Sequence, residues 1–314
     1  MLLRLSLAIL ALTGLGIAAR PALARIIVVG PERAIKSPGQ AAALVRDGDR
    51  VLFEPGTYRD CAVWTASRLT LEATRPGVLF TGAVCAGRAI FIFLGHDIVI
   101  RGLTLAEAHG PFHNAAGILM ESDNLTVENS RFINNENGIL AGGGPASRVR
   151  VFNSEFRGNG SCLGACAHGI YTGNPISLLY VHHCLFRDTQ TAHHVKSRAR
   201  VTVVTDSDIA DGPAGTSSYL IDLPTGGEVL ISDNRLEKGP ASANPAVAIS
   251  IGEQKDRHQP GLVVIRDNQF TNDLPAPTLF VRNQTNTPIR LLGNRFTGAV
   301  VPLEGFGTVE PSAE

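Results

Sequence analysis

The chain has 314 residues, of which 28 are basic and 28 are acidic. This balance excludes the strongly basic face that binding to nucleic acid requires, so we expect no nucleic acid partner. The length suits one large repetitive domain or two smaller ones. Because no low-complexity linker divides the sequence, we expect a single domain over residues 25–314.

Residues 1–24 have the layout of a secretory signal peptide. Arg4 precedes an apolar stretch over residues 5–19, and a small-x-small motif ends at Ala24. This order predicts cleavage after Ala24, whereas a membrane anchor is disfavoured because the apolar stretch is short and is followed by Arg20. We therefore expect a nearly neutral, periplasmic or secreted protein that is not membrane-bound after cleavage.

The next element is a predicted short helix at about residues 37–46. Ser37 suits the N-cap and Pro38 the first helical position, while Ala41, Leu44 and Val45 would form an apolar face. A D-G-D turn then leads into a strand. Such a helix would cover the open end of a solenoid, which otherwise exposes its core and a strand edge.

An eight-residue pattern then recurs seven times at irregular spacing. The copies are LTVENSRF (125–132), VRVFNSEF (149–156), LYVHHCLF (179–186), TVVTDSDI (202–209), VLISDNRL (229–236), VVIRDNQF (263–270) and IRLLGNRF (289–296). Each copy begins with strand-like alternation, passes through a mostly polar pair and ends on Phe, Leu or Ile. Polar side chains stacked at one bend per layer would bridge successive layers, and the Phe positions would stack inside. Parallel coils with loops of variable length explain the uneven spacing.

The segment GQAAALVRDGDRVLFEPGTY (39–58), followed by these N-S-x-F and D-N-x-F copies, resembles the pectate-lyase-like superfamily of right-handed parallel β-helix proteins. The resemblance covers nearly the whole chain after residue 24. It implies an all-β, right-handed parallel β-helix with a short N-terminal capping helix. That superfamily includes lyases, hydrolases, epimerases, adhesins and proteins without enzymatic activity, so function has to be argued from the site.

The five cysteines suit an oxidising compartment. Cys61 and Cys85 are about one repeat apart, and Cys162 and Cys166 share one Gly-rich loop, so both pairs are plausible disulfides and Cys184 would remain buried. The alternative is a zinc site in which His168 and His182 join the second pair, but the spacing matches no familiar zinc motif. We predict no metal site and identify no cofactor.

A second strand is predicted before the eight-residue pattern in each repeat. With the number of the first residue, these strands are GILME (117), GILAG (138), GIYTG (169), HVKSR (194), LIDLP (220) and VAISI (247). Side chains alternate along a strand, so Ile118, Ile139, Ile170, Val195 and Ile221 would point inward and the residue after each would point outward. The outward column is then Leu119, Leu140, Tyr171, Lys196 and Asp222. Layers about 4.8 Å apart would bring the last three into contact.

The segment HHVKSRAR (193–200) makes this column unusually charged. Alternation predicts that His194 and Arg198 flank Lys196 on the outward face, with His168 at the edge of the patch. One interpretation is a solvated surface with a structural Lys196–Asp222 pair. The other is a groove for an acidic polysaccharide.

In the second interpretation the catalytic candidates are Lys196, Tyr171 and His194, and the substrate-binding candidates are Arg198, Asp222 and His168. Cleavage of a uronate polymer by β-elimination needs a base, a cation near the carboxylate and an acid for the leaving oxygen. Lys196 could be the base, Arg198 could neutralise the carboxylate, and Tyr171 could support a sugar ring. Asp222 opposes this role, because a neighbouring carboxylate favours protonated lysine.

The pair Lys196-Ser197, followed by TVVTDSDI, resembles the lysine strand of chondroitinase-B-like and alginate lyases. The arginine motif that this resemblance implies on the next layer is absent, since that layer reads LIDLPTGG. The carboxylates expected for calcium are reduced to Asp188. Only Lys196 therefore carries over, and calcium is not predicted.

Two other chemistries of the fold are less well supported. Asp206 and Asp208 share a face as the aspartates of a hydrolase would, but Asp206 is predicted to occupy the ladder position that Asn129 and Asn153 fill. His183 is predicted to replace the ladder asparagine in its own copy. The D-P-H-D segment of uronate epimerases is absent. The sequence thus predicts a monomeric, exported protein that acts on or binds an acidic polysaccharide, with a non-catalytic carbohydrate-binding or envelope structural protein as the alternative.

Overall fold

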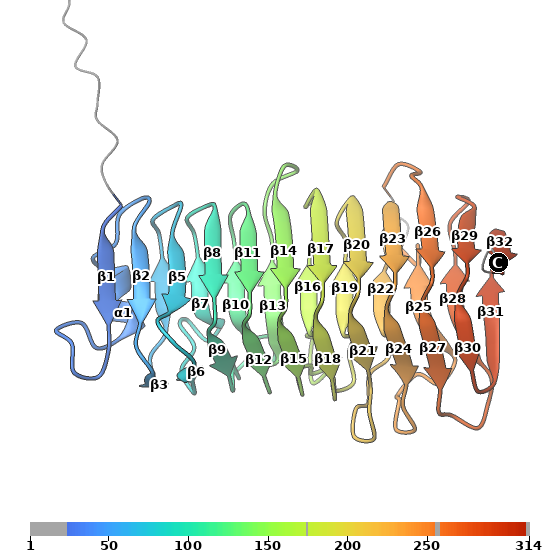
Figure 1. The fold of residues 1–314 in the computed structure, drawn as a ribbon, viewed down its shortest axis with the longest axis horizontal. Coiled ribbons are helices and arrows are strands. Elements are labelled where there is room, and N and C mark those ends of the chain that lie inside the picture. Colours follow the sequence, from blue (N-terminus) through green and yellow to red (C-terminus); the bar gives the residue numbers. More distant parts are fainter. Residues whose placement is uncertain (1–23, 174, 255–257, 312–314) are drawn as a thin grey trace, which may run out of the picture.

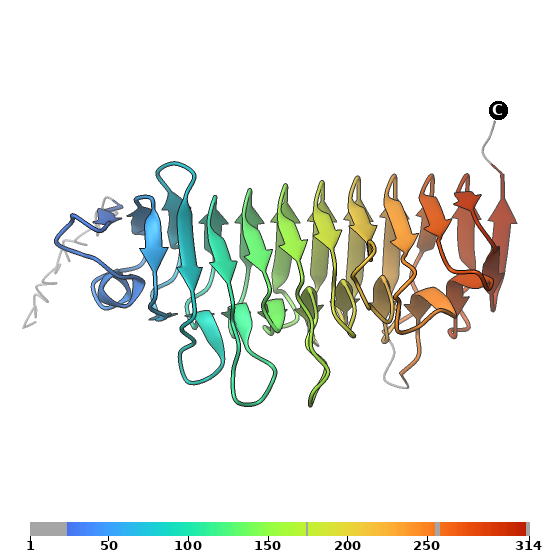
Figure 2. The ribbon, with the colours of Figure 1, turned by 90° about the horizontal axis from the view of Figure 1, so that it is seen from below.

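The computed structural model describes residues 24–173, 175–254 and 258–311. Strands are stacked side by side along one long axis, from the N-terminal end to the C-terminal end (Figure 1). Seen from below, the stack keeps its cross-section while loops of unequal length project from it (Figure 2). The predicted signal peptide, except its last residue, lies outside the described residues.

The described residues form one short helix, α1 (Pro38–Ala42), and 32 strands in three sheets, which we call A, B and C. Sheet A contains β1 (Ile26–Val29), β2 (Arg50–Phe53), β5 (Thr70–Ala73), β8 (Ile98–Arg101), β11 (Leu125–Glu128), β14 (Arg148–Phe152), β17 (Leu178–His182), β20 (Val201–Thr205), β23 (Glu228–Ser232), β26 (Val263–Arg266), β29 (Ile289–Leu292) and β32 (Gly307–Glu310). Sheet B contains β3 (Gly56–Tyr58), β6 (Val78–Thr81), β9 (Thr104–Ala106), β12 (Arg131–Ile133), β15 (Glu155–Arg157), β18 (Leu185–Arg187), β21 (Asp208–Ala210), β24 (Arg235–Lys238), β27 (Gln269–Asn272) and β30 (Arg295–Thr297). Sheet C contains β4 (Ala62–Trp64), β7 (Ala89–Phe93), β10 (Ala116–Met120), β13 (Asn137–Ala141), β16 (Ile170–Thr172), β19 (Val195–Ser197), β22 (Ile221–Leu223), β25 (Val247–Ile251), β28 (Thr278–Asn283) and β31 (Val300–Glu304).

From β2 to β31 the chain visits the three sheets in turn, so each coil there adds one strand to every sheet and neighbouring strands run parallel, while β1 and β32 extend sheet A alone. The predicted β-solenoid is therefore confirmed. The last residue of the eight-residue pattern stacks inside it, as predicted. The rings of Phe132 and Phe156 are 4.8 Å apart, and those of Phe156 and Phe186 are 4.6 Å apart. Full burial stabilises each such side chain by about 1.5–3 kcal/mol relative to exposure.

The polar pairs lie at the bend between sheets A and B, and their two members have different roles. The first residue takes a left-handed backbone conformation, with φ of 50° at Asn129, 55° at His183 and 50° at Asp206. The second residue is buried and bonds to the neighbouring layer: Ser207 N donates to Asn234 Oδ1 at 2.9 Å. The prediction that His183 and Asp206 occupy the ladder position is therefore wrong, because the following residue makes the ladder.

The ends and cross-links largely match the sequence predictions. Ser37 caps α1 by accepting from Gln40 N at 3.3 Å, and Ala41 is buried, but Leu44 is exposed because the helix ends at Ala42. Both predicted disulfides, Cys61–Cys85 and Cys162–Cys166, are present, and Cys184 is buried with a free thiol. Two of the proposed zinc ligands are thus bonded to each other.

Within the part of the chain that the structure describes, no helix has the length and apolar character needed to cross a membrane.

Candidate functional site on sheet C

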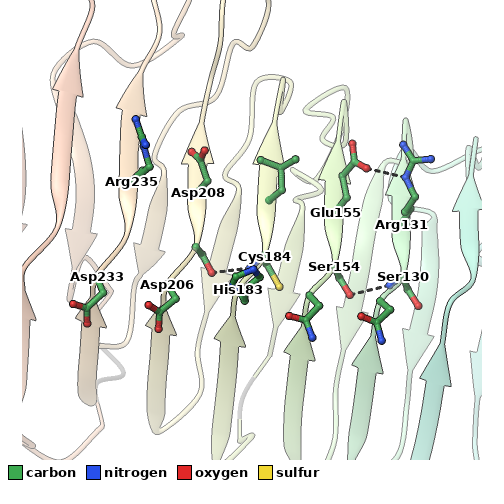
Figure 3. A pocket seen from close by; sticks show the side chains of 14 residues that line it. Ser130, Arg131, Ser154, Glu155, His183, Cys184, Asp206, Asp208, Asp233 and Arg235 are labelled. Carbon is green, nitrogen blue, oxygen red and sulfur yellow. Dashed lines mark hydrogen bonds and ion pairs between the residues drawn. The ribbon is translucent and has the colours of Figure 1, made fainter.

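A groove of about 660 Å³ runs along the bend between sheets A and B. Figure 3 shows its repetitive lining, with Ser130 and Ser154 towards one end, His183 and Cys184 in the middle, and Asp206 and Asp233 towards the other end. The same bend recurs in every layer, so the groove follows from the repeat itself. Its size alone does not identify a site.

The charged side chains of this groove are largely paired with one another. Arg131 Nε lies 2.8 Å from Glu155 Oε2, and Arg187 makes two hydrogen bonds to Asp208, at 2.8 and 2.6 Å. Asp206 lies at the bend, and His182 Nδ1 is 3.4 Å from its carboxylate. A paired Asp208 and a bend Asp206 are not two free carboxylates for acid and base catalysis, so the hydrolase alternative gains no support.

The outward column of sheet C has the predicted register. Leu140 pairs with Tyr171, Tyr171 with Lys196, and Lys196 with Asp222, on the adjacent strands β13, β16, β19 and β22. The inward neighbours, among them Val195, are fully buried. Tyr171, Lys196 and Asp222 therefore lie on consecutive layers of one face.

Lys196 and Asp222 form a short ion pair that is shielded from solvent. Lys196 Nζ lies 2.7 Å from Asp222 Oδ2, and the two side chains are 15% and 2% exposed. Asp222 Oδ1 is buried without a hydrogen-bond partner among the described residues. Burial raises the pKa of Asp222, and the attraction of Lys196 only partly offsets that effect. A carboxylate in this state is unusually ready to take up a proton.

A second residue, His193, faces the same carboxylate oxygen, with Nε2 at 3.4 Å from Asp222 Oδ2. Its Nδ1 accepts a hydrogen bond from Tyr219 N at 3.1 Å, which assigns the hydrogen of the neutral ring to Nε2. The ring is stacked between those of His168 and Tyr219. Burial, followed by repulsion from Lys196, lowers the pKa of His193 to about 3, so the ring is neutral at ordinary pH.

Tyr171 and Arg198 form the exposed side of the patch. An Nη1–H of Arg198 donates to the Tyr171 hydroxyl oxygen, and the Arg198 guanidinium carbon lies 5.2 Å from the centre of the Tyr171 ring. Arg198 Nε also donates to Gln254 Oε1 at 3.2 Å. Because the tyrosine oxygen accepts from Arg198, its own O–H is directed to another acceptor.

The outward orientation predicted for His194 is wrong. Its side chain is wholly buried, with Nε2 3.0 Å from Asp211 Oδ1 and Nδ1 2.8 Å from Thr189 Oγ1. Strand β19 begins only at Val195, so the alternation that places Lys196 outward does not extend back to His194. His194 therefore does not reach the patch that contains Lys196.

His168 is at the patch but is almost fully buried, and its Nδ1 accepts from His193 N at 3.2 Å. Its ring packs edge-on against Tyr171 at 5.2 Å. Burial, and then the neighbouring His193, lower its pKa well below the ordinary value. His168 thus supports the Tyr171 and His193 rings from below the surface.

Sequence reasoning missed His193 and Tyr219. Both belong to loop segments immediately before strands of sheet C, where side-chain direction does not follow from alternation. A signal was nevertheless present, since HHVKSRAR offers two adjacent histidines of which only one can share the face of Lys196. Choosing between them requires knowing where the strand begins.

Among the described residues, no three His, Cys, Asp or Glu side chains come together as potential ligands of a metal ion.

A family model described as a right-handed beta helix region matches residues 32–178. An alginate lyase from Paenibacillus sp. str. FPU-7 superposes with a TM-score of 0.65 and 16% identity, over 90% of this chain and 99% of that one. The fold is that of right-handed parallel β-helix proteins.

Two further β-helix structures are similar over most of their length. Pectate lyase Pel9A has a TM-score of 0.53 and 15% identity, over 91% of this chain and 77% of that one. Pectin methylesterase PemA from Erwinia chrysanthemi has a TM-score of 0.50 and 10% identity, over 92% and 94%. No curated protein sequence gives a significant match. Similarities at these identities concern the β-helix fold, and the chemistry has to be argued from the site.

Proposed function

We propose that this protein binds a uronate-containing polysaccharide across sheet C and cleaves it by β-elimination. The observation that carries the proposal is the arrangement of a hydroxyl, an amine and a guanidinium on two consecutive layers, in Tyr171, Lys196 and Arg198. The three β-helix structures described above are named as enzymes of polysaccharides, two of them lyases, which supports this class of partner.

Each of the three groups has a defined part in the reaction. Arg198 binds the uronate carboxylate and stabilises the charge that develops on it. Lys196 Nζ takes the proton from the carbon next to the carboxylate. As the double bond forms and the bond to the glycosidic oxygen breaks, the Tyr171 hydroxyl gives its proton to that oxygen.

Lys196 must lose its own proton before it can act as a base. Asp222 is the group that can receive this proton, because burial raises its pKa and leaves Oδ1 without a partner among the described residues. His193 directs its Nε2 hydrogen at the same carboxylate and holds it in place. Asp222 and His193 are positioning residues in this mechanism, which replaces the catalytic role first assigned to His194.

The alternative is a binding protein without catalysis. The 2.7 Å contact between Lys196 Nζ and Asp222 Oδ2 favours it, since a lysine that stays protonated binds carboxylates but removes no proton. In both cases we propose an exported monomer, periplasmic or secreted. Two disulfides are expected in an oxidising compartment.

The test is to incubate the purified protein with alginate, pectate, chondroitin and glucuronate-containing bacterial polymers. Unsaturated sugar ends are followed by ultraviolet absorbance, and binding is measured separately. We expect product from at least one polymer, and a loss of 10²-fold or more in Lys196→Ala, the range typical of acid–base catalysis. Lys36→Ala, at an exposed lysine before α1, is the matched control and should retain full activity.

Binding without product, unchanged by Lys196→Ala, would establish the binding protein instead. An absence of both binding and product across the panel would reject both versions.

A further inference from the structure

A lysine, an aspartate and a histidine that the proposed mechanism does not use lie together in the interior of the solenoid. Asp211 follows β21, Lys238 ends β24, and these two strands are neighbours in sheet B. Lys238 Nζ lies 3.7 Å from Asp211 Oδ2, and His194 Nε2 lies 3.0 Å from Asp211 Oδ1. All three side chains are 0% exposed. An amine and a carboxyl group are therefore held next to each other away from water.

The contacts of Lys238 direct its amine at this carboxyl group. Lys238 Nζ donates to the backbone carbonyls of Ser217, at 3.3 Å, and Ser218, at 2.6 Å. A neutral amine has two hydrogens, and the two carbonyls can accept both of them. The lone pair of the amine is then left for the remaining close neighbour, Asp211. Burial lowers the pKa of Lys238 to about 8 although Asp211 raises it, so the neutral amine is accessible near neutral pH.

The carboxyl group of Asp211 has a donor at each oxygen. His194 Nε2 donates to Oδ1 at 3.0 Å, and Gly239 N donates to Oδ2 at 3.1 Å. In the neutral histidine ring this places the hydrogen on Nε2, so Nδ1 accepts from the Thr189 hydroxyl at 2.8 Å. Two N–H groups aimed at a carboxyl group stabilise the negative charge of a tetrahedral intermediate. Burial disfavours the charge of Asp211, but the hydrogen bond from His194 outweighs burial and lowers the pKa of Asp211, so the pair starts as an ammonium and a carboxylate.

We propose that Lys238 and Asp211 condense after folding into an amide bond that cross-links two neighbouring layers of the solenoid. The Lys238 ammonium first gives a proton to Asp211 Oδ2, which leaves a neutral amine and a carboxylic acid. Nζ then attacks Cγ of Asp211, and the N–H of His194 stabilises the charge that develops on Oδ1. A second proton passes from Nζ to Oδ2, the bond between Cγ and Oδ2 breaks, and one water molecule is released.

The product suits the contacts that surround the reactants. The new amide keeps one N–H, for which the Ser218 carbonyl is the acceptor, and Oδ1 still accepts from His194. The reaction replaces a buried ion pair by a neutral amide and so removes the desolvation cost of two buried charges. Groups held in a reactive alignment reach effective molarities on the order of 10⁵–10⁸ M, which compensates for the small population of the neutral pair. Exclusion of water from the site protects the bond from hydrolysis.

The ion pair on sheet C provides an internal control with the same residue types. Lys196 Nζ is closer to its carboxylate, at 2.7 Å from Asp222 Oδ2, but the Lys196 side chain is 15% exposed. Asp222 Oδ1 has no hydrogen-bond partner among the described residues, so none of their N–H groups would stabilise charge on that oxygen. We expect no amide bond between Lys196 and Asp222.

Peptide mapping of the purified wild-type protein tests the proposal. Reduction and alkylation first open the disulfides, so that these cannot join peptides, and trypsin then cleaves after lysines whose amine is free. We expect residues 201–235 to be joined to the peptide that begins at Leu236, with no cleavage after Lys238. The mass should be that of the two peptides less one water. Fragmentation should locate the bond at Asp211, and cleavage after Lys196 should be normal.

Variants separate the reactive groups from the donor. Lys238→Met and Asp211→Ala should each give only unlinked peptides. His194→Leu keeps both reactive groups and should slow the linkage by about 10²-fold, the effect of losing one donor to an oxyanion, which lowers the linked fraction in freshly made protein. His194→Gln keeps an N–H and should retain the cross-link. Circular dichroism verifies the fold of each variant.

The wild-type result decides the proposal whether or not any variant folds. Separate peptides with ordinary cleavage after Lys238 would overturn it, and so would a bond from Lys238 to a carboxyl group other than that of Asp211. Equal linkage in freshly made His194→Leu and wild-type protein would overturn the role given to His194. The cross-link requires no polysaccharide, so this result is independent of the proposed function.

Discussion

Two His–Asp–Lys groups lie on opposite sides of the chain around β19. On the outer side His193 and Lys196 face Asp222, at 3.4 and 2.7 Å. On the inner side His194 and Lys238 face Asp211, at 3.0 and 3.7 Å. The residue types are the same, and adjacent histidines supply the two rings. What differs is how completely each group is buried and hydrogen-bonded.

The inner group is closed to solvent and well hydrogen-bonded. Lys238 is fully buried and donates to the Ser218 carbonyl at 2.6 Å, while Gly239 N donates to Asp211 Oδ2 at 3.1 Å. Burial lowers the pKa of Lys238 to about 8 despite the nearby Asp211. The outer group leaves Asp222 Oδ1 without a partner among the described residues, and Lys196 still reaches solvent. The comparison indicates a structural role for the inner group and supports the ligand-binding role that we propose for the outer one.

The largest expected effect on stability comes from removing the inner carboxylate. Asp211→Asn leaves the fully buried Lys238 without its counter-charge, and we expect a loss of roughly 3–5 kcal/mol in the free energy of unfolding. Asp222→Asn should cost less than about 1 kcal/mol, because Lys196 can turn towards water. Urea unfolding of both variants at pH 6 measures the difference. Equal losses of unfolding free energy in the two variants would contradict the inference that the inner carboxylate is the more important for stability.

The second effect is a pH dependence that involves His193. The pKa of His193 is about 3 in the folded protein, below the ordinary value of 6.5. Between pH 3 and pH 6.5 the ring is therefore protonated in the unfolded chain and neutral in the folded protein. Stability is therefore lost as the pH falls from 6.5 towards 3, by roughly 2 kcal/mol at pH 5 from this residue. The raised pKa of Asp222 acts in the opposite direction, so the comparison has to be made between variants.

His193→Asn keeps an acceptor for Tyr219 N but does not titrate. In this variant we expect the difference between the unfolding free energies at pH 7.5 and pH 5 to be smaller by roughly 2 kcal/mol. An unchanged pH dependence would show that His193 is accessible to protons in the folded state, against its burial.

The smallest effect on stability is expected for Tyr171→Phe. The variant loses one hydrogen bond at the surface, to Arg198, and should lose no more than about 1 kcal/mol of unfolding free energy. Product formation should nevertheless fall by at least tenfold, because the leaving oxygen loses its acid. Tyr180→Phe, on the outer face of sheet A, is the matched control and should affect neither property. Full activity in Tyr171→Phe would show that the Tyr171 hydroxyl is not the acid that protonates the leaving oxygen.

The sequence alone was sufficient for the architecture and for much of the patch. Seven copies of one pattern predicted the parallel solenoid, the stack of Phe132, Phe156 and Phe186, and the polar bend. Alternation within the strands predicted that Tyr171, Lys196 and Asp222 lie on consecutive layers. These inferences succeed because strand periodicity and layer spacing are local properties that repeat along the chain.

Only the tertiary structure decided which of the two adjacent histidines lies on the same face as Lys196. His193 and His194 precede β19, where direction depends on contacts with Tyr219 on the next layer and with Asp211 in the interior. The burial of Asp222 likewise depends on packing between layers, not on its place in the sequence. A periodic sequence determines which residues share a face, because backbone geometry alone sets that order. Protonation and accessibility depend on what the neighbouring coils and loops cover, and only the folded chain contains that information.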